Sequence, residues 1–152
     1  CGFLGDPEKP CRCTPDQVQR YRSRISGPLL DRIDLHIPVG RLPPGELLGT
    51  GDMGEASAEV RARVCQSRGT QQRRQGCANA QSPPNQLAIA CELGAKEKNY
   101  LESAARRMIL SGRALHRTLR VARTIADLAG SPAISTDHIS EALAYRGADL
   151  HP

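Results

Sequence analysis

The sequence predicts a mainly α-helical protein, with a small helical bundle in its second half and a loop-rich first part that contains one short strand. The bundle is predicted because, from about residue 87 onward, apolar residues recur at helical spacing and Ser and Gly stand where helices would begin and end. The strand is predicted by the strict alternation of apolar and polar residues over 33–39. We find no internal repeat in the sequence.

The first part divides into two segments. Residues 1–19 are rich in Gly, Pro and Cys and show no period, so we expect loops ahead of the strand and treat 1–40 as one unit. The stretch that follows, GRLPPGELLGTGDMG, holds too many Gly residues for a helix or a strand, and Pro43 and Pro44 strengthen this interpretation. It predicts a linker over residues 41–54.

A solvated helix and a connecting loop are expected over residues 55–86. Residues 55–75 are mostly helix formers, with a thin apolar stripe that contains Ala56, Val60 and Val64. The stretch ANAQSPPNQ then breaks the helix, because it holds two consecutive prolines.

The helical bundle is predicted over residues 87–147, with residues 148–152 as a tail. One helical face is marked by apolar residues at i, i+3, i+4, i+7 and i+8, namely Leu101, Ala104, Ala105, Met108 and Ile109. Ser111 is the expected N-cap of the next helix, and Gly130 is placed to end that helix in a left-handed conformation. Ser135 is the expected N-cap of the last helix, which ends near residues 145–147.

Charge and composition narrow the class of protein. The formal net charge is +5, and Arg supplies 18 of the 21 basic residues. Arg suits planar, bidentate contact with phosphate better than Lys does, so the bias indicates phosphate chemistry, although a GC-rich genome would produce the same bias. The sequence has no run of about 18 apolar residues, which a membrane span would need, and it does not open with a signal peptide. We therefore expect a cytoplasmic protein without membrane contact.

Three of the six cysteines form a candidate metal site. Cys11 and Cys13 make a Cys-x-Cys pair, and Cys1 lies ten residues before the first of them. Three thiolates can ligate Zn²⁺, but a closed structural site usually has four ligands. The alternative is a set of free thiols in a flexible end. Nothing else indicates secretion, so a disulfide scaffold is not expected.

Arginines supply the other candidate sites. Arg32 stands between Asp31 and Asp34, either as a surface arginine paired with one of them or as a cation positioned to stabilise a transferring phosphoryl group. The polar side of the helix after Ser111 carries four arginines and a single acid, Asp127. The four are Arg113, Arg117, Arg120 and Arg123. This side is either solvated or bound to an anion that offsets the repulsion between the arginines.

Two long stretches resemble bacterial magnesium-chelatase-like AAA+ ATPases of the competence-protein branch. CGFLGDPEKPCRCTPDQVQRYRSRISGPLLDRIDLHIPV is similar to the part of these proteins that follows the Walker motifs. SGRALHRTLRVARTIADLAG followed by ISTDHISEALAYR is similar to their C-terminal lid. The Walker A loop, the Walker B acids and the sensor-1 Asn would all precede Cys1. The resemblance therefore implies a C-terminal fragment of a longer ATPase, with a remnant of the αβ core before the lid and no hydrolysis by this part alone.

The resemblance also implies roles for single residues. Arg32, in GPLLDRIDL, matches the arginine finger that acts in trans on the nucleotide of a neighbouring subunit, and Asp31 lies at the subunit interface. Arg113 matches the sensor-2 arginine, and Arg117 and Arg120 are close enough on the helix to take that role instead. The family pattern pairs Cys-x-Cys-Gly with a later Cys-x-Cys, which implies a Zn²⁺ site of which Cys1, Cys11 and Cys13 are present here. Cys65, Cys77 and Cys91 match no motif of the family.

For the full-length protein, the resemblance implies ATP and Mg²⁺ as cofactors, a hexameric ring, and DNA as the partner in branch migration during recombination or natural transformation. Two other functions stay open. One is a chelatase-type ATPase that remodels a metal-insertion partner. The other is a helical binding module without enzymatic activity, whose arginine face contacts an acidic protein or nucleic acid.

Overall fold

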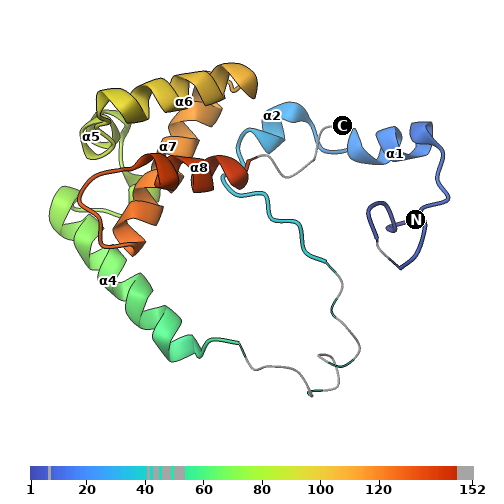
Figure 1. Ribbon diagram of the computed structural model, residues 1–152, viewed down its shortest axis with the longest axis horizontal. Coiled ribbons are helices and arrows are strands. Elements are labelled where there is room, and N and C mark those ends of the chain that lie inside the picture. Colours follow the sequence, from blue (N-terminus) through green and yellow to red (C-terminus); the bar gives the residue numbers. More distant parts are fainter. Residues whose placement is uncertain (7, 41, 43–44, 46–48, 50–53, 147–152) are drawn as a thin grey trace.

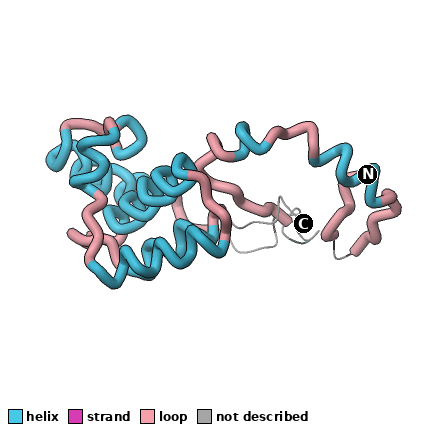
Figure 2. The backbone as a smooth tube through the Cα atoms, turned by 90° about the horizontal axis from the view of Figure 1, so that it is seen from above, coloured by secondary structure: helices cyan, strands magenta, loops and turns pink. Residues whose placement is uncertain are grey.

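A computed structural model describes residues 1–6, 8–40, 42, 45, 49 and 54–146. The described residues are mainly helical, as predicted, and they contain no β-strand (Figures 1 and 2). The helices are α1 (Pro15–Arg22), α2 (Gly27–Leu30), α4 (Ser57–Gln75), α5 (Pro84–Ala90), α6 (Ala95–Arg107), α7 (Gly112–Leu128) and α8 (Thr136–Ala144), with a 3-10 turn, η1 (Asn79–Gln81). Most of the predicted linker and the whole predicted tail lie outside the described residues.

The core forms where α4 and α8 pack on α7 and α6 packs on α8 (Figure 1). Ala122 and Ala126 of α7 are completely buried, and their small side chains let the neighbouring helices approach closely. Ile139 of α8 is also completely buried. Larger side chains from α5, α6, α8 and the segment before α8 close the cluster, among them Leu87, Leu101, Leu143 and Ile134.

The helix ends follow the predicted caps. The Ser111 hydroxyl accepts a hydrogen bond from Ala114 N at 3.1 Å, and Ser135 caps α8 in a capping box with His138. Gly130 has φ +68°, the left-handed conformation predicted for it. Because these caps satisfy backbone groups locally, they fix where α7 and α8 begin and where the chain turns between them.

Helix α4 is solvated over its first half, as its thin apolar stripe predicts. Residues 57–66 are all exposed, and the only buried residues of the helix, Ser67 and Gln71, lie nearer its C-terminus. The helix ends at Gly76, which has φ +73°. The C-terminal half of α4 therefore holds it to the bundle, and the N-terminal half extends into solvent.

The short strand predicted over 33–39 is not formed. A strand exists only when its backbone groups pair with a neighbouring strand, and no second strand lies in the part of the chain that the structure describes. The segment instead runs as a single extended chain from the end of α2 (Figure 1). Ile37 and Val39 are 63% and 89% exposed, so its apolar alternation is not buried here.

Candidate functional site

Residues 31–36, called here the junction segment, lie against the start of α7. The Asp31 carboxylate accepts a hydrogen bond from the Ser111 hydroxyl at 2.9 Å. The Arg117 guanidinium donates at 2.5 Å both to the Asp34 carboxylate and to the backbone carbonyl oxygen of Arg32. These three bonds fix the backbone on both sides of Arg32.

The end of α8 holds the same segment from a second side. The Arg146 guanidinium donates to the carbonyl oxygens of Asp31 and Ile33, each at 3.3 Å. His36 N–H donates to the carbonyl oxygen of Tyr145 at 2.7 Å. Burial lowers the pKa of the Arg146 guanidinium from its ordinary value, although the nearby carboxylates of the segment act in the opposite direction.

Arg32 is not paired with the aspartates that flank it. Asp31 and Asp34 bond to α7 instead, and the Arg32 side chain is exposed, with no hydrogen bond or ion pair among the described residues. The short helix α2 precedes it, begun by Pro28 in its first turn and anchored by the buried Leu30. The site thus holds the Arg32 backbone rigidly and leaves its guanidinium available.

Arg113 lies in the first turn of α7, beside the contact between α7 and the junction segment. It is the second residue of α7, two positions after the Ser111 N-cap, and its exposed side chain makes no hydrogen bond or ion pair within the described part of the chain. The first turn of a helix also carries unpaired N–H groups and the positive end of the helix dipole. Arg32 and Arg113 therefore flank the Asp31–Ser111 hydrogen bond, each with an unengaged guanidinium.

The remaining arginines of α7 are engaged. Arg117 is bonded to the junction segment, and Arg120 donates a weak 3.4 Å hydrogen bond to the carbonyl oxygen of Ser82. Arg123 is only 2% exposed and donates to the carbonyl oxygens of Ser131 and Pro132 at 2.7 and 3.0 Å. The polar side of the helix is thus neither wholly solvated nor a single anion-binding face, because protein oxygens offset most of its charge.

Asp127 is the centre of a buried polar network that sequence reasoning missed. Its carboxylate accepts two hydrogen bonds from Arg74 of α4, at 2.6 and 2.9 Å, one from Arg123 at 3.1 Å and one from Asn79 at 2.9 Å. Burial raises the pKa of Asp127, but the bonds from Arg74 and Asn79 and the charge of Arg123 outweigh it and leave the pKa below its usual value. The one available signal was that Asp127 is the only acid on α7.

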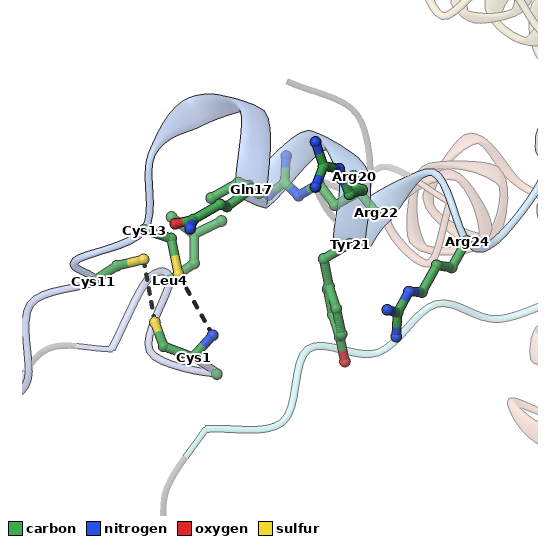
Figure 3. A pocket seen from close by; sticks show the side chains of 11 residues that line it. Cys1, Leu4, Cys11, Cys13, Gln17, Arg20, Tyr21, Arg22 and Arg24 are labelled. Carbon is green, nitrogen blue, oxygen red and sulfur yellow. Dashed lines mark hydrogen bonds between the residues drawn. The ribbon is translucent and has the colours of Figure 1, made fainter.

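The three cysteines predicted as metal ligands are brought together. The Sγ atoms of Cys1, Cys11 and Cys13 all lie within 4.8 Å of one another, and Figure 3 shows Cys1 meeting Cys11 and Cys13 from the other end of the loop before α1. Zn–S bonds of about 2.3 Å in a tetrahedral site place sulfur atoms about 3.8 Å apart, and the Sγ atoms of Cys1 and Cys11 are 3.5 Å apart. Cys91 is different, because burial raises the pKa of its thiol to about 11.

No helix among the described residues is long and apolar enough to cross a lipid bilayer.

Comparison with known proteins gives consistent matches over both parts of the chain. The profile described as "Magnesium chelatase, subunit ChlI C-terminal" matches residues 54–146, and the one described as "Magnesium chelatase, subunit ChlI" matches residues 1–47. Competence protein ComM of Haemophilus influenzae is 47% identical over 135 residues, which cover 89% of this chain and 26% of that protein.

Two further relatives show the same coverage. Uncharacterized protein YifB of Escherichia coli is 43% identical over 138 residues, 91% of this chain and 27% of its own length. Uncharacterized protein Mb2921c of Mycobacterium bovis is 35% identical over 145 residues, 93% of this chain and 28% of its own length. The chain thus spans about a quarter of the length of the curated relatives it matches.

Proposed function

Because the chain belongs to the magnesium chelatase subunit ChlI family of AAA+ ATPases, we propose that its junction segment and α7 complete an ATP site between neighbouring subunits of a ring. One observation carries this proposal. Both aspartates beside Arg32 are bonded to other groups, so the guanidinium is left unpaired on a fixed backbone. An arginine with only a local role at the surface would be expected to form an ion pair with Asp31 or Asp34.

Arg32 acts as the arginine finger. Its guanidinium reaches the terminal phosphoryl group of ATP in the neighbouring subunit and stabilises the negative charge that develops during transfer. Arg113 approaches the phosphates from the first turn of α7, where the helix dipole also favours an anion. Asp31 acts at the same subunit interface by keeping the junction segment against Ser111.

The rest of the ATP site comes from outside these residues. The sequence contains no Gly-x-x-x-x-Gly-Lys-Ser/Thr loop. Mg²⁺, when bound with ATP, neutralises charge on the β- and γ-phosphates. We therefore assign to this chain the finger, the sensor arginine and their support, and to the full-length protein the binding of ATP and Mg²⁺.

We propose that the full-length ATPase uses ATP hydrolysis to move DNA. The name of the competence relative and the net charge of +5 both favour DNA as the partner, and we propose a hexamer that drives branch migration during recombination or natural transformation. The family name instead favours a chelatase-type ATPase that remodels a metal-insertion partner. Stimulation of ATP turnover by DNA, lost as salt is raised, separates the first function from the second.

The test of the finger uses the full-length protein. Arg32→Ala is expected to lower ATP turnover on the order of 10³-fold with little change in nucleotide affinity, because a finger acts on the transition state. Arg61→Ala, which removes an exposed arginine of α4, is the matched control and should change turnover little.

Mixing the Arg32→Ala protein with a phosphate-loop mutant should restore part of the turnover, because each supplies the half that the other lacks at mixed interfaces. If rings assemble and no turnover returns, Arg32 has only a structural role.

We also propose that Cys1, Cys11 and Cys13 bind a thiophilic metal such as Zn²⁺, with the fourth ligand outside this set. The support is that these three side chains, from two ends of a loop, meet within 4.8 Å. Titration with Co²⁺ should give the absorption of a cobalt–thiolate complex, which Cys11→Ser removes and Cys65→Ser leaves unchanged. Equal cobalt spectra for the Cys11→Ser and unmodified proteins would exclude this site.

A further inference from the structure

A basic and aromatic patch lies on α1 and the turn after it, well away from the junction segment. It consists of Arg20, Tyr21, Arg22 and Arg24; Figure 3 shows Tyr21 and Arg24 extending in one direction and Arg20 and Arg22 in another. No acidic residue occurs between Asp16 and Asp31, and none of the three arginines has an ion pair among the described residues. The charge of this patch is therefore not offset locally.

Tyr21 gives the patch a second kind of contact. Its side chain is 73% exposed, unusually open for a large ring, and the Arg24 guanidinium lies over the ring at 5.8 Å from the centroid. Nucleic-acid bases stack on aromatic rings and on guanidinium planes, and arginines bind phosphate oxygens in a bidentate manner. The run Arg-Tyr-Arg-Ser-Arg provides both contacts within five consecutive residues.

The patch borders a hollow large enough for a nucleotide. The hollow is about 670 Å³ and lies between α1 and the residues at 1–4 and 11–13, with the four patch residues, Leu4 and Val18 in its lining. Ligand pockets commonly measure about 300–1,000 Å³ and combine apolar walls with a few placed polar groups. An unstacked base could enter this hollow while its phosphates stay at the arginines.

We propose that this patch binds single-stranded nucleic acid, with bases stacked on Tyr21 and phosphates held by Arg20, Arg22 and Arg24. A single strand is favoured over a duplex because a duplex keeps its base faces stacked internally, where an exposed ring cannot reach them. An acidic protein would use the arginines but has no need of the exposed ring. The proposal rests on the proposed function for DNA as partner, but the binding itself needs no ATP.

The experiment measures binding of a fluorescein-labelled 20-nucleotide oligo(dT) by anisotropy, without ATP, with this chain and with the full-length protein. Tyr21→Ala should raise Kd about tenfold, in line with the loss of one stacked base, and Tyr21→Phe should leave it within about twofold. The triple variant Arg20→Gln, Arg22→Gln, Arg24→Gln should raise Kd at least tenfold. It should also flatten the slope of log K against log salt by about 2, because single strands lose about 0.7 per phosphate contact.

The matched control is Arg61→Gln, Arg68→Gln, Arg106→Gln, which removes the same charge from exposed sites on α4 and α6. It should change Kd less than threefold. If this control weakens binding as much as the patch triple does, only net charge matters and the proposal fails. Equal competition by a 20-base-pair duplex would overturn the preference for single strands.

A further outcome identifies a protein partner instead. If the patch variants lose ring assembly while oligo(dT) affinity is unchanged, the patch is a subunit contact and the proposal is wrong. The result is independent of the ATP-site proposal, because Arg32→Ala protein should bind oligo(dT) as tightly as the unmodified protein. Binding that survives with Arg32→Ala and fails with Tyr21→Ala supports the patch whatever the role of the finger.

Discussion

The Ser111 hydroxyl joins Asp31 to α7, across 80 residues of sequence. It donates to the Asp31 carboxylate at 2.9 Å and accepts from Ala114 N–H at 3.1 Å. One hydroxyl therefore caps the helix and holds the junction segment. A shift of Asp31 must be accompanied by a change in the first turn of α7, where Arg113 lies.

A double-mutant cycle should detect this link. Ser111→Ala should destabilise the chain by about 1 kcal/mol through loss of the cap alone, and Asp31→Ala by less. Measured by urea unfolding, the two changes should be non-additive by about 0.5 kcal/mol. Ser135→Ala is the matched control, since it removes the cap of α8 without any bond to the junction segment. The control pair, Asp31→Ala with Ser135→Ala, should be additive. If Asp31→Ala with Ser111→Ala is additive as well, the Asp31–Ser111 hydrogen bond contributes nothing to stability.

We predict that Arg113 senses the nucleotide and that Arg117 has a structural role. Arg113→Ala should leave the melting temperature unchanged, because its side chain has no partner among the described residues, but should reduce the nucleotide-dependent change in distance between lid and core. Arg117→Ala should destabilise the chain by about 1 kcal/mol, because it loses its bonds to Asp34 and to the Arg32 carbonyl oxygen.

The paired measurement is thermal melting of this chain and fluorescence energy transfer in the full-length protein. If the Arg113→Ala chain melts several degrees lower, that residue is structural. Nucleotide-dependent closure that survives Arg113→Ala but is lost in Arg120→Ala would place the sensor about two turns further along α7.

Removal of the Asp127 carboxylate should be among the most damaging single changes in the chain. Asp127→Ala leaves Arg123, which is 2% exposed, as a buried cation without its counter-charge. Such a loss costs about 3–5 kcal/mol. Urea unfolding at neutral pH measures it, with Glu92→Gln as a control that alters an exposed acid. A loss no larger than that of the control would show that Arg123 is satisfied by carbonyl oxygens alone.

The same carboxylate should make stability fall in acid. The pKa of Asp127 is below its ordinary value in the folded chain, so its contribution is complete above the ordinary value of 3.8 and is lost as pH falls through the folded pKa. The free energy of unfolding should therefore drop more steeply below about pH 4 in the unmodified chain than in Asp127→Asn. Parallel pH profiles for the two would contradict the lowered pKa.

Cys91 should be far less reactive than Cys65. Burial raises the pKa of the Cys91 thiol to about 11, so roughly one thiol in a thousand is ionised at pH 8, whereas Cys65 is exposed. Alkylation by iodoacetamide followed by mass spectrometry should label Cys65 first. In urea the two should react at similar rates. Rapid labelling of Cys91 in the native chain would reveal frequent opening of the core.

The features that the sequence predicted correctly are those fixed by near neighbours. Ser111, Gly130 and Ser135 act on backbone groups within a few residues, so α7 and α8 could be placed from pattern alone. The same kind of signal was overlooked at α1, where Thr14 and Gln17 form a capping box.

Features that depend on distant partners could not be predicted in this way. Arg123 was placed on the polar side of α7, yet it is buried because Asp127 and the carbonyl oxygens after α7 satisfy it. The strand predicted over 33–39 requires a neighbouring strand, which periodicity within the segment cannot supply. The clustering of three cysteines was indicated by spacing, but their approach to one another needed the structure.

Helix α4 is held to the bundle at one end only. Its C-terminal end is fixed where Arg74 meets Asp127, and its first half has no packing partner in the described bundle. At 1.5 Å per residue, Ser57 lies about 26 Å from Arg74 along the axis. A rotation of α4 by about 10° at this pivot would therefore move Ser57 through about 4.5 Å, so a small tilt at the bundle becomes a displacement of several ångströms at the N-terminal end of α4.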